Sequence, residues 1–231
     1  MQSLGTNYRA LVIGASGTIG SAFVSALRQD GNCACVVELS RRTTPAITLE
    51  DEASIVEAAD AIRSQGPFAL IVDATGALTI DGAGPEKHLG ALDANKLMRS
   101  FQVNTIGPAL LIKYFLPLLR NDRTIYAKLS ARVGSISDNR KGGWYGYRAS
   151  KAALNMMLQT AGIEFSRKNK QAVLVALQPG TVASPLSQPF ASASHTISAQ
   201  ESVTGLLQHI DALEPVSGAH FIDYAGQTIP W

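Results

Sequence analysis

The feature that most constrains the fold of this chain is the regular alternation of short apolar runs with longer segments that carry apolar residues at helical spacing. Runs that are apolar along their whole length, separated by helices, are typical of strands in a parallel sheet with helices on both faces. The pattern predicts a doubly wound α/β fold of about seven strands, in a single domain spanning residues 1–231. The predicted strands cover residues 8–13, 33–39, 46–49, 68–72, 123–129, 172–177 and 219–223, and the predicted helices cover 19–29, 51–65, 94–120, 145–167 and 200–213.

The composition excludes several classes of partner. Charged residues make up 16% of the chain and the formal net charge is +2, without the Lys- and Arg-rich stripe that nucleic-acid binding requires. The longest apolar stretch, residues 106–119, contains Lys113 and two prolines, which argues against a membrane span. Cys33 and Cys35 lack further cysteine ligands, so we expect reduced core residues and no metal site. With a polar N-terminal segment that does not resemble a signal peptide, the chain is expected to be cytoplasmic.

A glycine-rich turn follows the first predicted strand and opens the first predicted helix. Glycine lets the backbone approach a pyrophosphate, and a helix N-terminus supplies free N–H groups and the positive end of a dipole. The composition of the turn is weak evidence by itself, but its position between strand and helix favours a Rossmann-type dinucleotide site. The predicted cofactor contacts in this turn are Gly14, Ser16, Gly17, Thr18, Ile19 and Gly20.

The end of the second predicted strand bears on the choice between NAD and NADP. An acidic residue at this position binds the ribose hydroxyls of NAD, whereas a basic residue accommodates the 2′-phosphate of NADP. Glu38 lies within the strand, while Ser40 and Arg41 follow its end, where a phosphate would lie. A guanidinium matches phosphate geometry, so we favour NADP(H) over NAD(H), the alternative being that Arg41 and Arg42 are solvated surface residues.

Three further segments carry a family signature. Tyr147 and Lys151 lie four residues apart in the run Tyr-Arg-Ala-Ser-Lys-Ala-Ala-Leu. Asn104 lies in the run Phe-Gln-Val-Asn-Thr-Ile-Gly-Pro, and Pro179 and Gly180 form a turn after the sixth predicted strand. Through these segments the chain resembles the short-chain dehydrogenase/reductase family over essentially its whole length, and in particular the branch that contains C-factor-like proteins and small carbonyl reductases.

Tyr147 and Lys151 are the strongest candidates for catalysis. Side chains four residues apart share one face of a helix, and a nearby ammonium favours the phenolate, lowering a tyrosine pKa from its ordinary value of about 10. Tyr147 can then protonate a carbonyl oxygen or remove a proton from an alcohol. The resemblance implies further that Lys151 holds the nicotinamide ribose and that Asn104 positions a water in a proton relay. Tyr145 would point to another side of the helix.

Two more turns are expected to complete the cofactor site, because the family uses the corresponding turns. After the fourth predicted strand the family's usual Asn-Asn-Ala-Gly is replaced by Asp-Ala-Thr-Gly, and we expect Gly76 to keep its backbone role. The Pro-Gly turn after the sixth predicted strand touches the nicotinamide in the family. The predicted cofactor residues here are Ala74, Thr75, Gly76, Pro179, Gly180, Val182 and Ser184, together with Asn104, Tyr147 and Lys151.

The chain departs from the family at the catalytic serine. The family commonly has Ser-Ser before x-x-Gly, and the second serine is replaced here by Ala131. Ser130 is closer in register, but strand alternation would aim it at the opposite face. Ser135 follows Gly134 and a short loop would bring it into the site. Both serines remain candidates for the hydrogen bond to the developing oxyanion.

Two functions are compatible with these features. The first is an NADP(H)-dependent reductase of a small aldehyde, ketone or quinone, for which the loop 184–198 would cover a neutral substrate because it carries no charge apart from that of His195. The second is a cofactor-binding signalling or regulatory protein with little turnover. Asn104, Tyr147 and Lys151 favour the enzyme, and Ala131 is the feature that favours the alternative. The family resemblance also implies a homodimer or homotetramer.

Overall fold

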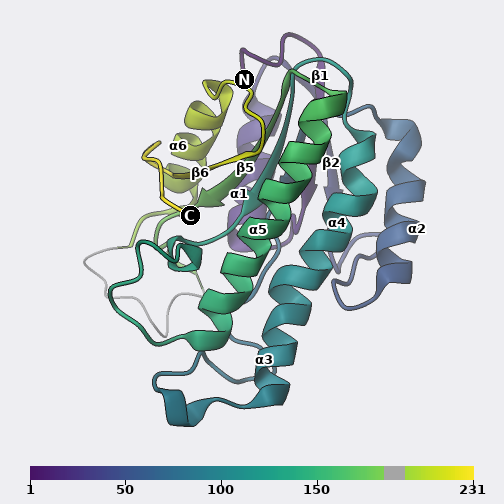
Figure 1. Cartoon of the computed structure of the whole chain (residues 1–231). Helices are drawn as coiled ribbons and strands as arrows, with labels where there is room; N and C mark the ends of the chain where they lie inside the picture. Colours follow the sequence, from purple (N-terminus) through teal and green to yellow (C-terminus); the bar gives the residue numbers. More distant parts are fainter. Residues whose placement is uncertain (185–195) are drawn as a thin grey trace.

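The apolar runs of the sequence form one parallel sheet in the computed structural model, which describes residues 1–184 and 196–231. Within these residues the sheet has six strands in the order β2-β1-β3-β4-β5-β6 (Figure 1). The predicted doubly wound α/β fold is therefore confirmed. The strands are β1 (Tyr8–Ile13), β2 (Cys33–Leu39), β3 (Leu70–Asp73), β4 (Thr124–Leu129), β5 (Ala172–Gln178) and β6 (Ala219–Asp223).

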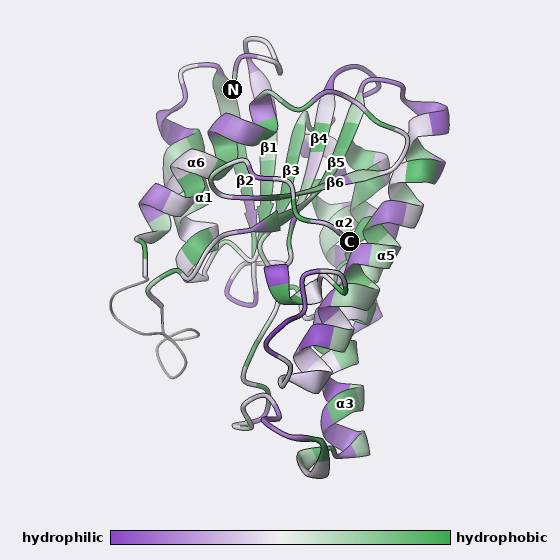
Figure 2. Cartoon of the chain, turned by 60° about the vertical axis from the view of Figure 1, so that its left-hand side comes forward, coloured by the Kyte–Doolittle hydropathy of each residue, from purple (hydrophilic) through white to green (hydrophobic). Residues whose placement is uncertain are grey.

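Helices cover both faces of the sheet (Figures 1 and 2). On one face lie α2 (Glu52–Ile62), α4 (Gly107–Phe115) and α5 (Tyr145–Lys168), and on the other lie α1 (Thr18–Gln29) and α6 (Ala199–Asp211). Successive strand residues point to opposite faces, so Leu11 and Ile13 pack under the first group while Ala10 and Val12 pack under the second. In the described parts of the chain, no helix combines the length and apolarity needed to cross a membrane.

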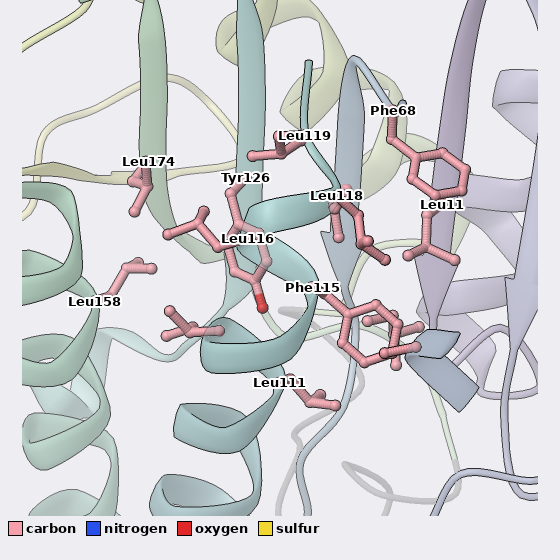
Figure 3. Packing of buried hydrophobic residues seen from close by; sticks show 14 of the residues in the cluster. Leu11, Phe68, Leu111, Phe115, Leu116, Leu118, Leu119, Tyr126, Leu158 and Leu174 are labelled. Atoms are coloured by element: carbon pink, nitrogen blue, oxygen red, sulfur yellow. The ribbon is translucent and has the colours of Figure 1, made fainter. Parts of the chain in front are cut away.

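The core under α4 and α5 fixes these helices against the strands that lead to the site. Figure 3 shows Phe115 of α4 and Tyr126 of β4 among leucines from neighbouring elements, and both aromatic side chains are fully buried. Leu158 of α5 packs in the same cluster. Burying a large apolar side chain stabilises a fold by roughly 1.5–3 kcal/mol, so many such contacts hold α5 in one register on the sheet.

One predicted strand does not form. Residues 46–49 make a loop in which Ile47 is buried and its N–H donates to the carbonyl of Ser40 at 3.1 Å. The hydroxyl of Ser54 accepts from the N–H of Thr48 at 3.0 Å, which ties the same loop to the start of α2. The backbone groups of this short run are thus bonded within a connection rather than to the edge of the sheet, and the sheet has one strand fewer than the sequence suggested.

The single long helix predicted for residues 94–120 is interrupted. α3 (Ala94–Phe101) is followed by a π-helical turn (Gln102–Ile106), then by α4, and a 3-10 turn (Leu116–Leu118) ends the segment. Pro108 has no N–H to donate to the carbonyl of Asn104, which removes one α-helical hydrogen bond at this point. Wider turns of this kind occur often at functional sites, and this one presents Asn104 to the turn after β3.

Candidate active site

The turns that follow β1, β3, β4 and β5 meet at the edge of the sheet where the parallel strands end. β1 lies between β2 and β3, and the chain leaves β1 and β3 toward opposite faces, so a crevice opens between their turns. A cavity of about 540 Å³, which we call the Arg41 cavity, is lined by Gly14, Ser16, Gly17, Ser40, Arg41, Arg42, Ile47, Leu49, Glu50, Ala74, Thr75, Gly76, Ala77 and Val103. A cavity of about 220 Å³, the Tyr147 cavity, is lined by Ile19, Leu78, Ser130, Ala131, Arg132, Val133, Trp144, Tyr147, Gln178, Pro179, Gly180, Thr181, Val182 and Ser184.

Most of the predicted cofactor residues line one of these two cavities, and four do not. Thr18 begins α1. Gly20 lies in the first turn of α1, packed against the backbone of the turn after β1. Asn104 and Lys151 are buried behind Gly76. The predicted substrate loop 184–198 lies mostly outside the described residues.

Close backbone contact requires glycine at two positions of the first turn. Gly14 has φ +83°, and a Cβ there would lie 3.0 Å from the carbonyl carbon of Ala74. A Cβ on Gly20 would lie 2.1 Å from the carbonyl oxygen of Gly14. α1 therefore starts directly against the turns after β1 and β3, and its N-terminus is directed at the Arg41 cavity, whose wall includes Gly17.

Two arginines at the Arg41 cavity have no partner of opposite charge in the described part of the chain. Arg41 and Arg42 are exposed, and neither guanidinium forms an ion pair with any residue of 1–184 or 196–231. The carboxylate of Glu38, by contrast, pairs with Arg28 of α1. Ser40 is buried, and its hydroxyl accepts from the N–H of Arg42 at 3.0 Å, which shapes the turn that carries both arginines. Both guanidinium groups therefore lie where the sequence predicts the 2′-phosphate of NADP.

Asn104 and Lys151 lie behind Gly76, in the turn after β3 whose residues line both cavities. The carboxamide of Asn104 bonds both polar groups of Ala77: Nδ2 donates to its carbonyl at 2.8 Å and Oδ1 accepts from its N–H at 2.9 Å. A Cβ on Gly76 would lie 3.0 Å from Nζ of Lys151 and 3.3 Å from Oδ1 of Asn104. Glycine at this turn thus lets two polar side chains reach the backbone that faces the cavities.

Tyr147 and Lys151 lie on the same face of α5, as their spacing predicts. Nζ of Lys151 is 5.7 Å from the centroid of the Tyr147 ring, and that ring meets Trp144 edge to face with 6.2 Å between centroids. Burial raises the pKa of Tyr147 to about 12, against the lowering expected from an ammonium alone. Burial, together with the nearby ammonium of Lys128, lowers the pKa of Lys151 to about 7. Lys151 is therefore only partly charged at neutral pH.

Sequence reasoning missed a buried ion pair beneath Lys151. Lys128 of β4 and Asp73 of β3 are adjacent in register and both side chains are fully buried, with Nζ 2.8 Å from Oδ1. Nζ of Lys128 also donates to the carbonyl of Thr75 at 2.8 Å, and the N–H of Thr75 donates to Asp73 at 2.9 Å. The signal was present in the sequence, because a lysine inside an otherwise apolar central strand needs an anionic partner.

The two candidate serines lie in different places. Ser130 lines the Tyr147 cavity, but its hydroxyl donates to Oδ1 of Asn155 at 2.6 Å. Ser135 is buried and lines neither cavity, and its hydroxyl accepts from the N–H of Asp138 at 3.0 Å. The side chain of Ala131 lies at the cavity wall where the family has its serine.

The chain is similar to several known proteins over most of its length. A family model described as short chain dehydrogenase matches residues 8–195. A 1-hydroxy-2-glutathionyl-2-methyl-3-butene dehydrogenase of Rhodococcus sp. (strain AD45) is 31% identical over 96% of this chain and 98% of its own. The C-signal protein of Myxococcus xanthus is 37% identical over 62% of this chain and 83% of its own. The NADPH-bound carbonyl reductase from chicken fatty liver superposes with a TM-score of 0.82 at 23% identity, covering 98% of this chain and 100% of that one, and so shares the fold.

Proposed function

The chain belongs to the short-chain dehydrogenase family and is an oxidoreductase that acts on CH–OH or C=O groups, and from this premise we propose that it reduces a small carbonyl compound with NADPH. The observation that carries the proposal is the position of Tyr147 beside Lys151, at a cavity that the Pro179-Gly180 turn also lines. The Rhodococcus relative is a dehydrogenase of a 1-hydroxy compound, and the superposed chicken protein is a carbonyl reductase, which supports alcohol–carbonyl chemistry here.

The residues around the Arg41 cavity fit nicotinamide adenine dinucleotide phosphate, NADP(H). The glycine contact between the turns after β1 and β3 leaves backbone exposed to the cavity, and the N-terminus of α1 favours a pyrophosphate. Arg41 and Arg42 would hold the 2′-phosphate, since their guanidinium groups have no carboxylate partner in the described residues. When bound, the reduced nicotinamide supplies a hydride to the carbonyl carbon.

Tyr147 supplies the proton in the proposed mechanism. A phenol with a pKa of about 12 keeps its proton at neutral pH and is ready to donate it to the oxygen as negative charge develops there. The charged form of Lys151, within 5.7 Å of the ring centroid, stabilises the phenolate that results. Asn104 holds the backbone of Ala77, and with it the turn that separates the two cavities.

The NADP preference predicts a selective loss on removing Arg41. Arg41→Ala is expected to weaken NADPH binding by about 10–100-fold, the equivalent of the roughly 1.5–3 kcal/mol of a hydrogen bond to a charged group. Binding of NADH, which lacks the phosphate, should change little. Fluorescence titration of both nucleotides measures the two dissociation constants. Arg63→Ala, which removes an exposed arginine outside both cavities, serves as the control, and an equal loss for NADH and NADPH would contradict a phosphate contact.

The pKa of Lys151 predicts proton uptake on cofactor binding. In the free protein Lys151 is charged below about pH 7 and neutral above it, because burial and Lys128 oppose the charge while Asp73 only partly offsets them. Hydroxyl acceptors of a bound ribose favour the charged form, so NADPH affinity should be highest below pH 7 and fall as pH rises, by up to about tenfold per unit. Calorimetry at pH 8 in two buffers of different ionisation enthalpy measures the proton taken up. Lys151→Met should abolish the uptake, and uptake that persists in this variant would assign it to another group.

A carbonyl panel tests the proposed function directly. Aldehydes, ketones and quinones are offered with NADPH, and the decrease in NADPH absorbance reports turnover. Turnover of at least one uncharged carbonyl is expected, since the Tyr147 cavity is lined largely by apolar residues and the guanidinium of Arg132 is paired with Asp223 at 2.9 Å. NADPH binding without turnover of any compound would overturn the proposal and favour the regulatory alternative.

We also propose that the chain forms a homodimer or homotetramer through α3 and α5. Apolar side chains are exposed on these two helices, among them Met98 on α3 and Met156 and Met157 on α5, of which Met156 is 66% exposed. Exposed apolar groups that cluster on neighbouring helices indicate a surface that is covered in an assembly. The two helices pack against each other and lie side by side (Figure 1).

A further inference from the structure

The oxygen of a carbonyl substrate needs a second hydrogen-bond donor besides Tyr147, because it has two lone pairs and gains negative charge as the hydride arrives. Ala131 carries no polar group at the wall of the Tyr147 cavity. We propose that the side-chain amide of Gln178 is this donor. The inference rests on the proposed carbonyl reductase function and adds a residue to its catalytic machinery.

The position of Gln178 directs its side chain toward α5. Ala176 of β5 packs in the core under α4 and α5, and side chains two residues apart on a strand share a face. Gln178 therefore lies on the same face of the sheet as Tyr147, and both line the Tyr147 cavity. In the parallel register Leu177 pairs with Leu129, so Gln178 lies beside the end of β4, where Ala131 follows.

The orientation of the amide is fixed by the backbone. Oε1 of Gln178 accepts a hydrogen bond from the N–H of Arg132 at 2.8 Å. Turning the amide over would place two donors against each other, so Nε2 points away from Arg132. Gln178 is half-buried, and its Nε2 forms no hydrogen bond with residues 1–184 and 196–231. An uncommitted donor thus belongs to a side chain that lines the same cavity as Tyr147 and Ala131.

The two serines that the sequence offered for this role are placed less well than Gln178. Ser130 donates to Asn155 at 2.6 Å in a fully buried contact. Ser135 lines neither cavity. In the proposed step the hydride forms the new C–H bond, Tyr147 transfers its proton to the oxygen, and Gln178 keeps both amide protons while its hydrogen bond shortens as charge develops.

Substitutions of Gln178 distinguish a role as hydrogen-bond donor to the substrate from a purely structural role. Gln178→Met removes the donor at similar volume, and Gln178→Glu keeps an acceptor for the N–H of Arg132 while losing the donor. Both variants are expected to lower kcat by about 10²-fold or more on the best carbonyl of the panel, with the Kd of NADPH from fluorescence titration unchanged. Adding Ala131→Ser to Gln178→Met should restore most of the lost kcat, since a hydroxyl then lies at the same wall. Gln171→Met, at the exposed residue just before the same strand, should retain parental kcat and Kd.

The outcomes distinguish this inference from the proposed function. Full kcat in both Gln178 variants of an active parent would overturn the inference and leave the reductase function standing. A raised Kd for NADPH with unchanged kcat would overturn it as well, by assigning the amide to the cofactor. A parent that binds NADPH but reduces no carbonyl would overturn both. A crystal structure of the Tyr147→Phe variant with NADPH and the carbonyl gives a readout without turnover, and Nε2 is expected within hydrogen-bond distance of the carbonyl oxygen.

Discussion

Replacing Tyr147 with phenylalanine is expected to lower kcat for carbonyl reduction by about 10³-fold, within the range of roughly 10²–10⁴ that general acid catalysis contributes. The hydroxyl is the only part of the side chain that is lost, so the edge-to-face contact with Trp144 remains and the fold should be unaffected. Binding of NADPH should be retained, because neither Arg41 nor the glycine turns depend on the hydroxyl. Steady-state kinetics together with fluorescence titration of NADPH measure both quantities.

Tyr145 provides the matched control for this prediction. It lies on the same helix two residues earlier, is 36% exposed, and does not line the Tyr147 cavity. Tyr145→Phe should keep the parental kcat. The proposed mechanism would be wrong if Tyr147→Phe consumed NADPH with the carbonyl as fast as the parent.

The fold was largely predictable because each strand and helix has its own local pattern. The predicted last strand at residues 219–223 coincides with β6, and the predicted start of α5 is correct at Tyr145. The strand predicted at residues 46–49 was wrong because a run of only four residues is too short for its pattern to distinguish a strand from a loop. The break between α3 and α4 depends partly on the contact of Asn104 with Ala77, 27 residues away, which no local pattern records.

The candidate site was predictable where its residues are close in sequence. Tyr147 and Lys151 are brought together by the helix period alone. The direction of the Tyr147 pKa was not predictable, because it depends on burial by several elements. The role of Gln178 was equally unpredictable, since the orientation of its amide is set by the backbone N–H of Arg132 in the turn after β4.

The buried pair of Lys128 and Asp73 carries the second large expected effect. Lys128→Met would leave the carboxylate of Asp73 buried without its cation, and breaking a buried pair in this way costs about 3–5 kcal/mol of unfolding free energy. Oδ2 of Asp73 already lacks a partner among the described residues, so little compensation is available there. The double variant Asp73→Asn with Lys128→Met should recover most of the loss, because an amide oxygen still accepts from the N–H of Thr75 and no charge is buried. Unfolding in guanidinium chloride measures the unfolding free energy of the parent, the single variant and the double variant.

An exposed ion pair provides the control for the buried pair of Lys128 and Asp73. Lys113 forms an exposed ion pair with Glu52 at 2.9 Å, and Lys113→Met should therefore change stability little, since solvent screens such pairs. The network of Lys128 and Asp73 also holds Thr75, next to Gly76 in the turn that borders both cavities. Loss of Lys128 should thus weaken NADPH binding as well as stability, and the double variant should regain stability more fully than affinity, because Thr75 has lost the ammonium that held its carbonyl. An unfolding free energy of Lys128→Met equal to that of the parent would show that the pair contributes nothing net to the fold.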